Sequence, residues 1–188
     1  MKKFLIYLVA SILIITIAAM VGLRSPSVQD RIMVSVVSGM INAPNNLPQE
    51  DALSAAVCGS RSPIPSPGRA ETCVMVRAGE NIYIVDIGDG SASNLRSWGI
   101  PFNKIKSVLL THLHSDHISD LADLHLASWI NENREAKLDI YGPDGVNLVT
   151  EGFETAYELD YFFRNTHHGE QIAPLDVAGL NPHTVDLN

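Results

Sequence analysis

The sequence is poor in cysteine, with only Cys58 and Cys73 among 188 residues. Two cysteines exclude a disulfide-dense scaffold and a zinc site built from four thiolates. The sequence also lacks an internal repeat, a low-complexity segment, a glycine-rich phosphate loop and a recognisable Ser/His/Asp order. Repeat architectures, nucleotide binding through a phosphate loop and triad hydrolysis are therefore not indicated.

Basic residues are also scarce, since 13 Lys and Arg stand against 21 Asp and Glu. The resulting net charge of −8 argues against a surface that holds nucleic acid through many phosphate contacts. From charge alone we expect nucleic acid to be an unlikely partner, although local basic patches are compatible with this composition.

The N-terminal segment, residues 1–23, contains the longest run of the sequence without a charged residue. Lys2 and Lys3 precede an uncharged run from Phe4 to Leu23. As a helix this run is roughly 30 Å long, close to the thickness of a bilayer core. It predicts a single-pass anchor or uncleaved signal, rather than a cleaved signal or a buried helix, because the cleavage pattern is poor and the run is long. The lysines predict an inner-membrane protein with an extracytoplasmic body.

Residues 24–51 differ in character from the anchor. Apolar residues recur at helical spacing in this region, and they are Ile32, Met33, Val36, Val37, Met40 and Ile41. The pattern predicts a short amphipathic helix that lies on the membrane surface or packs against the body. Residues 42–48 (NAPNNLP) are typical of a linker, so we expect globular structure over 52–188.

The globular part has the pattern of an α/β domain. We expect strands at 52–58, 72–77, 81–87, 105–111 and 138–141. Helices are expected at 91–98, at 118–130 and over about twenty residues from 144. Strands first and interleaved helices later predict helices that cover one face of a sheet.

The most informative motif is HLHSDH at 112–117, directly after the apolar run 108–110. In an extended segment, His112 and His114 lie on one face and can point at one cation. Asp116 and His117 follow where a helix begins, and they project toward a second position. Nitrogen and carboxylate ligands suit Zn²⁺, with Mn²⁺ or Fe as alternatives. A polar surface turn after a buried strand is the simpler alternative.

These residues resemble the metallo-β-lactamase superfamily, whose HxHxDH signature matches His112, His114, Asp116 and His117. The segments YIVDIGDG (83–90), CGSRSPIPSPGRA (58–70), LLTHLHSDHISDL (109–121) and IYGPDG (140–145) extend the resemblance toward the ribonuclease Z and arylsulfatase-like branch. The resemblance implies the N-terminal half of an αββα sandwich, two zinc ions, metal ligation by the four signature residues and an Asp86 that holds the ligand loop. A turn residue before Gly88 is the alternative interpretation of Asp86.

Members of this superfamily complete their site with a further His, Asp and His, which this chain does not obviously contain. The other histidines are His125, His167, His168 and His183. We expect His125 to be a buried structural residue of a helix. His167 and His168 lie in the polar stretch NTHHGE, interpreted as a loop over the metal cleft or a solvated loop. His183 is expected in an ordinary loop, although it lies close to where the resemblance implies the third ligand. We interpret the chain as a truncated or partial form.

The resemblance implies a hydrolase of phosphodiester, sulfate or related small-molecule esters, in which Asp116 also orients or deprotonates a metal-activated water. A ribonuclease Z-type endoribonuclease and a non-catalytic, membrane-tethered remnant with weak metal binding are the alternatives. Cys58 and Cys73 either form a disulfide, which an extracytoplasmic body permits, or remain as buried thiols.

Overall fold

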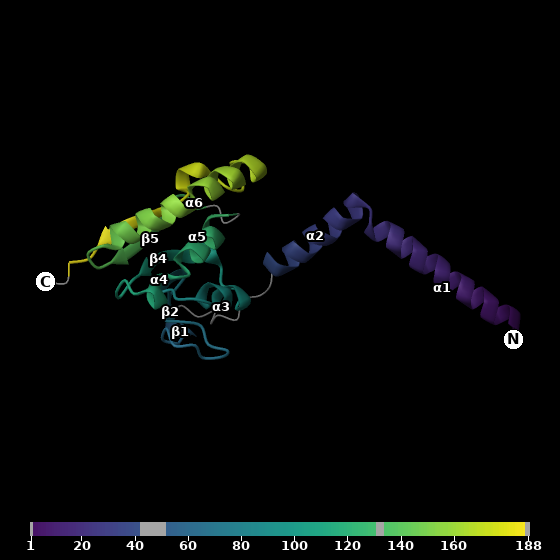
Figure 1. Cartoon of the computed structure of the whole chain (residues 1–188), viewed down its shortest axis with the longest axis horizontal. Helices are drawn as coiled ribbons and strands as arrows, with labels where there is room; N and C mark the ends of the chain where they lie inside the picture. The colour runs from purple at the N-terminus through teal and green to yellow at the C-terminus, as the bar shows by residue number, and fades with distance from the viewer. Residues whose placement is uncertain (1, 42–51, 131–133, 187–188) are drawn as a thin grey trace. The chain divides into compact units, whose positions relative to one another are not determined.

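Two helices make up the N-terminal unit, Met1–Pro44. In the computed structural model, which describes residues 2–41, 52–130 and 134–186, helix α1 spans Lys2–Leu23 and α2 spans Pro26–Ile41 (Figure 1). Both expected helices are confirmed as helices. Helix α2 begins earlier than its apolar pattern indicated, because proline is well tolerated in the first turn of a helix.

The membrane span expected at 1–23 is not supported. Over the described residues, no single helix combines the length and the apolar composition that crossing a membrane requires. The bent pair Ala10–Leu23 and Pro26–Ile32, with 82° between its axes, meets the requirement by length and composition only when the two are taken together. The linker expected at 42–48 lies outside the described residues.

The second unit, Asn45–Asn188, is built on a sheet of six strands in sequence order. The strands are β1 (Leu53–Gly59), β2 (Cys73–Ala78), β3 (Asn81–Val85), β4 (Ile105–Leu109), β5 (Leu138–Gly142) and β6 (Leu180–Thr184). Strands β1, β2 and β3 are antiparallel neighbours, whereas β3 to β6 run parallel. The mixed α/β fold expected from the sequence is therefore confirmed.

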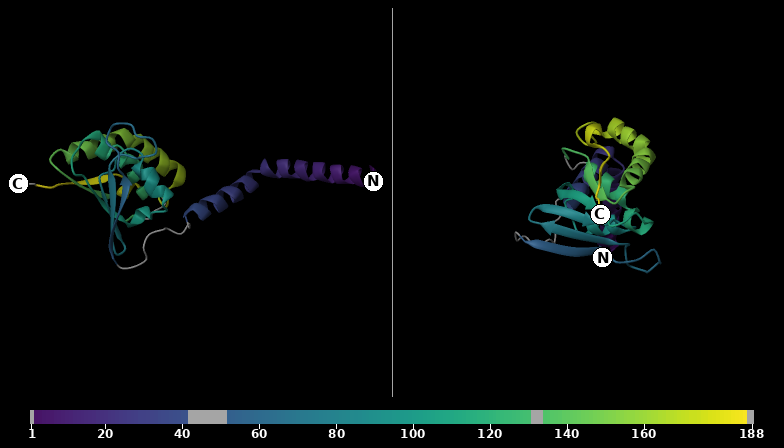
Figure 2. Two further views of the ribbon diagram at one scale, coloured as in Figure 1. Left: turned by 90° about the horizontal axis from the view of Figure 1, so that it is seen from below. Right: turned by 90° about the vertical axis from the view of Figure 1, so that its left-hand side faces the viewer.

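Helices connect the parallel strands and cover one face of the sheet (Figure 2). They are α3 (Ser91–Ser97), α4 (Ser115–Ile118), α5 (Leu121–Trp129) and α6 (Val146–His168), with short 3₁₀ turns η1 (Phe102–Lys104) and η2 (Leu175–Val177). The helix expected at 118–130 is confirmed as α5, which begins only at Leu121 because the chain turns after α4 ends at Ile118. The helix expected from 144 is confirmed as α6.

The core lies between the sheet and these helices. A row of paired residues crosses the sheet on this face, formed by Met75, Ile84, Val108 and Ile140. All four are at most 2% exposed, and they belong to one cluster with Leu95, Leu121 and Leu124 from the helices. The apolar alternation of the strands is what selects this face for burial.

The opposite face of the sheet is open in the described part of the chain. Its equivalent row is Val85, Leu109, Tyr141 and His183, from four adjacent parallel strands. Leu109 and Tyr141 are each 36% exposed, and the Tyr141 ring stacks on His183 with centroids 4.4 Å apart. An apolar and aromatic face of this kind is unusual for a sheet that meets only water.

A disulfide joins Cys58 at the end of β1 to Cys73 at the start of β2. The two Cα atoms are 5.0 Å apart and both side chains are buried. The structure thereby decides between the bridge and the free thiols that the sequence left open. The bridge closes the proline-rich segment between the first two strands into a loop.

Candidate metal centre

The candidate site lies where β3 and β4 end. Asp86 directly follows β3, and the residues from Leu110 to His117, here called the metal loop, follow β4. Both strands run parallel, so their carboxyl ends meet at one edge of the sheet. Asp86 N–H donates to the Leu109 carbonyl at 3.0 Å, which continues the pairing up to the loop. The strand order therefore places Asp86 beside the histidines.

His112 and His114 form the first donor pair. His112 Nε2 and His114 Nδ1 are 3.1 Å apart. Two nitrogen ligands at usual zinc distances and a tetrahedral angle are separated by about 3.4 Å. These two nitrogens are therefore arranged as two ligands of one ion would be.

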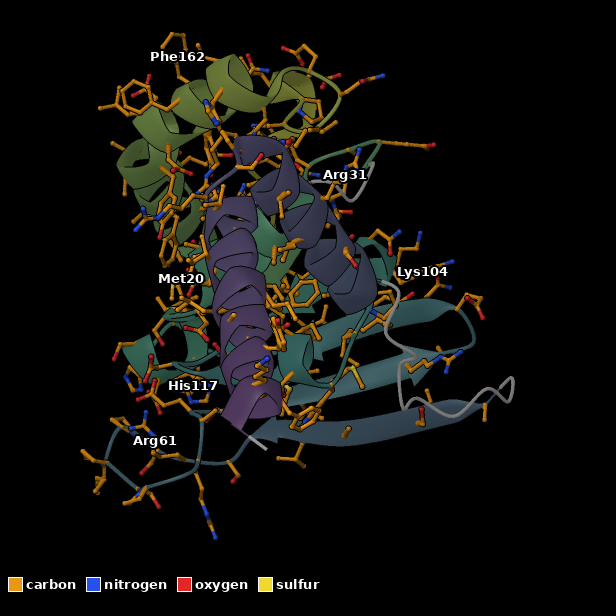
Figure 3. All side chains as sticks on the ribbon, turned by 90° about the vertical axis from the view of Figure 1, so that its right-hand side faces the viewer. Met20, Arg31, Arg61, Lys104, His117 and Phe162 are labelled. Carbon is orange, nitrogen blue, oxygen red and sulfur yellow. A yellow bond between two sulfur atoms is a disulfide. The ribbon has the colours of Figure 1, made fainter. Side chains whose placement is uncertain are left out.

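Asp116 and His117 form the second donor pair. His117 Nε2 lies 3.5 Å from Asp116 Oδ2, again close to the separation of two ligands on one ion. Asp116 is buried at the start of α4, whereas His117, labelled in Figure 3, is partly exposed. The rings of His112 and His117 are 3.9 Å apart, so the two pairs adjoin. Three imidazoles and a carboxylate are a donor set that fits zinc.

Asp86 fixes the orientation of the metal loop through three hydrogen bonds. Its Oδ1 accepts Thr111 N–H at 2.8 Å, and its Oδ2 accepts Thr111 Oγ1–H at 2.8 Å. The same Oδ2 lies 2.8 Å from His117 Nδ1. The side chain is 4% exposed, so these contacts are shielded from water.

This network assigns the protons of two histidines. With its Nδ1–H directed to Asp86, His117 presents an unprotonated Nε2 toward Asp116. Thr111 Oγ1 donates to Asp86 and lies 3.1 Å from His112 Nδ1, from which it accepts. His112 therefore also presents a bare Nε2. Outer hydrogen bonds of this kind are the usual way in which metal-binding imidazoles are oriented.

The backbone of Asp86 is strained in a way that serves this arrangement. Its φ is 57°, and it is the only residue other than glycine with a positive φ in the described segments. Such a conformation is uncommon for a residue with a side chain, although aspartate tolerates it better than most. The turn directs the carboxylate back across the end of β4.

Close backbone contact holds the two segments together. Ile87 N–H donates to the His117 carbonyl at 2.8 Å, and Asp120 N–H donates to the Ile87 carbonyl at 3.0 Å. A Cβ at Gly88 would overlap the Asp116 carbonyl oxygen. Glycine is therefore required at 88 for the metal loop to approach this closely.

Two buried carboxylates support the same region. Glu71 pairs with Arg61 at 3.2 Å and accepts Ser119 Oγ–H at 3.3 Å, just beyond the metal loop. Asp120 accepts Ala92 N–H at 2.9 Å at the start of α3. Burial raises the pKa of Asp120 above its usual range. These contacts link the metal loop to α3 and to the segment after β1.

The other histidines do not join this cluster. His125 is buried as expected, and its Nε2 accepts Gly179 N–H at 3.2 Å. Burial lowers its pKa to about 4, with Arg134 and Lys137 adding to the effect. Over residues 2–41, 52–130 and 134–186, no group of three or more His, Cys, Asp or Glu side chains is arranged to hold an ion. The metal loop thus offers two donors to each position.

Two expectations about the remaining histidines are wrong. His167 and His168 do not lie in a loop but form the exposed last turn of α6, where a polar sequence still continues the helix. His183 is not in an ordinary loop but in β6, and its Nε2 lies 2.8 Å from Asp139 Oδ1. Burial of Asp139 opposes its ionisation, but hydrogen bonds from His183 and Asn181 outweigh this, and the pKa of Asp139 is lowered.

Sequence reasoning missed Thr111. It makes two hydrogen bonds to Asp86 and one to His112, yet a single threonine before the first histidine carries no distinctive pattern. Its role follows only from the parallel pairing of β3 with β4. Whether the four signature residues bind metal stays a prediction.

Comparison with known proteins places these features in a family. Residues 66–185 match the family model described as "Metallo-beta-lactamase superfamily". A ribonuclease Z of Mycobacterium bovis is 38% identical over 124 residues, which cover 65% of this chain and 44% of the relative. One of Mycolicibacterium gilvum is 36% identical over 124 residues, 65% of this chain and 43% of the relative. The chain therefore spans less than half the length of these relatives.

Solved structures give the same fold. The short form of human tRNase Z is 24% identical with a TM-score of 0.52, and the match covers 69% of this chain and 43% of that one. At this identity the likeness shows the fold alone.

One prediction is corrected by these relatives. Nucleic acid was expected to be an unlikely partner, but the relatives are named as ribonucleases. Net charge was a poor guide because it sums over the whole chain, whereas a substrate meets the local field of one surface. The reported relatives also give no support to the arylsulfatase side of the resemblance.

Proposed function

Because the chain belongs to the metallo-β-lactamase superfamily, we propose that it carries the metal-binding loop of a zinc-dependent hydrolase that cleaves phosphodiester bonds in RNA. The observation that carries the proposal is the set of histidines whose protons are assigned by Asp86 and Thr111. The names of the relatives support RNA as the substrate. Manganese or iron is compatible with the same donors.

Each residue of the site has a distinct task. His112 and His114 would hold one ion, and Asp116 and His117 would hold a second. Bound zinc would supply activation of water and stabilisation of charge on the phosphoryl group. The Asp116 carboxylate would also orient the attacking water or accept its proton. Asp86 keeps His117 in the tautomer that leaves Nε2 free.

The open face of the sheet supports a larger assembly. We propose that the complete fold is an αββα sandwich in which a second sheet covers the row Val85, Leu109, Tyr141 and His183. Two observations favour this arrangement: Leu109 and Tyr141 are each 36% exposed, and the relatives are more than twice as long as the matched region. The second layer would also supply further ligands, in addition to the two side chains that the metal loop offers to each ion.

A second candidate is a domain that binds metal weakly and does not catalyse. It is favoured by the arrangement of donors in the described ranges, where no group of three is formed. Zinc usually needs three or four protein ligands for tight binding. On this interpretation the chain binds zinc with low affinity and turns over no ester.

The test combines metal binding with a substrate panel. The purified chain, and any longer product of the same reading frame, would be titrated with Zn²⁺ and assayed on a single-stranded RNA oligonucleotide, bis-p-nitrophenyl phosphate and p-nitrophenyl sulfate. We expect zinc-dependent cleavage of the RNA and of the phosphodiester, and loss of cleavage in Asp116→Asn. His168→Ala, at an exposed position in the last turn of α6 and outside the metal loop, serves as the matched control.

The outcomes separate the candidates. Zinc binding without hydrolysis in either product would favour the non-catalytic domain. Cleavage of the sulfate in preference to RNA would reject RNA as the substrate. If the chain bound no zinc, or if His112→Ala left zinc binding unchanged, both candidates would be rejected.

A further inference from the structure

The disulfide between Cys58 and Cys73 lies at an irregularity of the sheet. The register of β1 with β2 shifts between Val57 and Gly59, so Cys58 is an extra residue in β1. Such a bulge locally interrupts the ladder of backbone hydrogen bonds. In the part of the chain that the structure describes, β1 also pairs with β2 alone. The covalent bond therefore joins the two strands where backbone pairing holds them least.

The two ends of the loop that this bond closes pack tightly on each other. Ser60 N–H and Arg61 N–H both donate to the Ala70 carbonyl, at 3.0 and 2.9 Å. A Cβ at Gly59 would overlap the Glu71 carbonyl oxygen, so only glycine allows this approach. The side chain of Arg61, labelled in Figure 3, pairs with that of Glu71 at 3.2 Å. The position of Glu71 is therefore set by the segment that follows β1.

Glu71 in turn contacts both segments that carry the candidate site. Its N–H donates to the Asp89 carbonyl at 2.9 Å, and its Oε2 accepts Asp89 N–H at 3.1 Å. The same oxygen accepts Ser119 Oγ–H at 3.3 Å, just beyond the metal loop. A Cβ at Gly88 would overlap both the Glu71 Cβ and the Asp116 carbonyl oxygen. Glu71 thus lies against the turn that follows β3 and against the metal loop.

We propose that closure of the Cys58–Cys73 bond orders the metal loop for zinc, and that Glu71 is the positioning residue through which the bond acts. The proposal rests on the zinc-binding role proposed above for this loop. The bond fixes the backbone beside Glu71, and Glu71 fixes the turn after β3 and the end of the metal loop. With the bond open, the bulged end of β1 separates from β2 more easily, and Glu71 loses its fixed position.

The bond forms by thiol–disulfide exchange, with a small-molecule or protein disulfide as the oxidant. One cysteine thiolate attacks the oxidant and releases its first thiol, and the second cysteine then displaces the other. The cysteine pair loses two electrons and two protons, which leave with the two oxidant thiols. Both cysteines are at most 1% exposed in the folded chain, so the exchange precedes their burial. The bond therefore acts during maturation, and metal binding follows oxidation.

Amide hydrogen exchange of the zinc-free chain tests the effect of the bond without any metal. The oxidised chain is compared with a chain that has been reduced by tris(2-carboxyethyl)phosphine in urea and then refolded. Ile87 N–H donates to the His117 carbonyl and Asp120 N–H to the Ile87 carbonyl, so these amides report on the metal loop. We expect both to exchange about tenfold faster without the bond. Reoxidation with glutathione disulfide should restore the slow rates.

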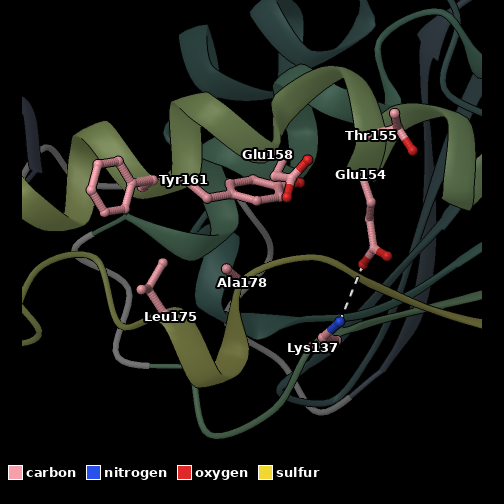
Figure 4. A pocket seen from close by; sticks show the side chains of 8 residues that line it. Lys137, Glu154, Thr155, Glu158, Tyr161, Leu175 and Ala178 are labelled. Carbon is pink, nitrogen blue, oxygen red and sulfur yellow. Dashed lines mark hydrogen bonds and ion pairs between the residues drawn. The ribbon is translucent and has the colours of Figure 1, made fainter.

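Glu71→Gln separates the positioning role from the bond, because it leaves both cysteines in place. Loss of the ion pair with Arg61 should accelerate the same amides and lower zinc affinity about fivefold, less than loss of a direct bond to a ligand histidine. Glu154→Gln is the matched control. Glu154 pairs with Lys137 at 3.3 Å (Figure 4) and accepts Leu180 N–H at 2.7 Å, at the amino ends of β5 and β6. This variant should change neither quantity.

Zinc titration of a double-mutant cycle tests whether the bond acts through Glu71. The cycle combines Glu71→Gln with the paired substitutions Cys58→Ser and Cys73→Ser. If Glu71 is the point through which the bond acts, removing the bond should cost little further affinity once Glu71 has been replaced. The two losses of zinc affinity should therefore fall short of additivity.

Each outcome decides for or against the proposal. Faster exchange at Ile87 and Asp120 without the bond and in Glu71→Gln, together with non-additive losses of zinc affinity, supports it. Unchanged exchange without the bond, unchanged exchange in Glu71→Gln, or additive losses overturn it. If the parent chain binds no zinc, the proposed function fails, whereas the exchange rates still decide whether the bond orders the metal loop. If circular dichroism shows that the reduced chain does not refold, exchange in Glu71→Gln, with its bond intact, decides.

Discussion

Replacing Asp86 by asparagine tests how the metal loop is held ready for an ion. The substitution keeps the size of the side chain, and asparagine also tolerates the positive φ of 57°. Oδ1 can still accept Thr111 N–H, but an amide NH₂ then replaces Oδ2. That oxygen accepts from Thr111 Oγ1 and contacts His117 Nδ1, each at 2.8 Å. A donor at this position forces His117 to move its proton to Nε2, the atom that should bind metal.

The expected magnitude follows from these contacts. Loss of an outer hydrogen bond to a metal-binding histidine usually lowers metal affinity about 10- to 100-fold, or roughly 1.4–2.7 kcal/mol. We expect this loss for Asp86→Asn in a calorimetric zinc titration at neutral pH. Long-range ¹H–¹⁵N correlations of the His117 ring should show the proton shifted from Nδ1 to Nε2.

Thr111→Val is the matched control, because it removes one hydroxyl from the same cluster but keeps the contact between Asp86 and His117. Its loss of zinc affinity should be smaller than that of Asp86→Asn. If Asp86→Asn bound zinc as tightly as the parent with an unchanged tautomer, the assigned role of Asp86 would be refuted.

Three further predictions concern stability and the approach of the metal loop. His125 has a pKa of about 4 in the folded chain against its ordinary 6.5, so the unfolded chain takes up the proton first as pH falls. The free energy of unfolding should therefore be highest above pH 6.5 and drop by about 3 kcal/mol toward pH 4. Urea unfolding at several pH values would measure this drop, and His125→Gln should flatten it. Gly88→Ala should displace the metal loop and weaken zinc binding at least tenfold, whereas Gly152→Ala, in open space, should leave it unchanged. Replacing Cys58 and Cys73 by serine opens a loop with a sequence separation of 15 and should lower the free energy of unfolding by about 3 kcal/mol, a result contradicted if chemical denaturation midpoints stay the same.

The elements of the second unit could be predicted where a single physical signal dominates. Alternating apolar residues located β2 and β3, and helical spacing located α6. Strand β6 could not be found this way, because Asn181 and Pro182 interrupt its pattern. Proline is tolerated there because, among the described residues, β6 lies at the edge of the sheet and pairs only with β5.

The candidate site was also only partly predictable. In an extended segment, histidines at alternate positions lie on one face in any fold, so the two donor pairs could be proposed from spacing. The network beneath them depends on residues brought together by strand pairing across 25 positions, as between Asp86 and Thr111. Sequence spacing carries no information about such contacts, and the same limit applies to the close approach of Gly88 to Asp116.

Position 86 also illustrates why chemical similarity is a poor measure of which substitutions a protein can accept. Two separate demands meet at this residue: a left-handed backbone and a short carboxylate with both oxygens engaged. Glutamate keeps the charge but is longer and poorly suited to the backbone, while glycine suits the backbone and removes the charge. Neither glutamate nor glycine can therefore replace Asp86. We expect aspartate at this position almost invariantly wherever the metal loop is functional.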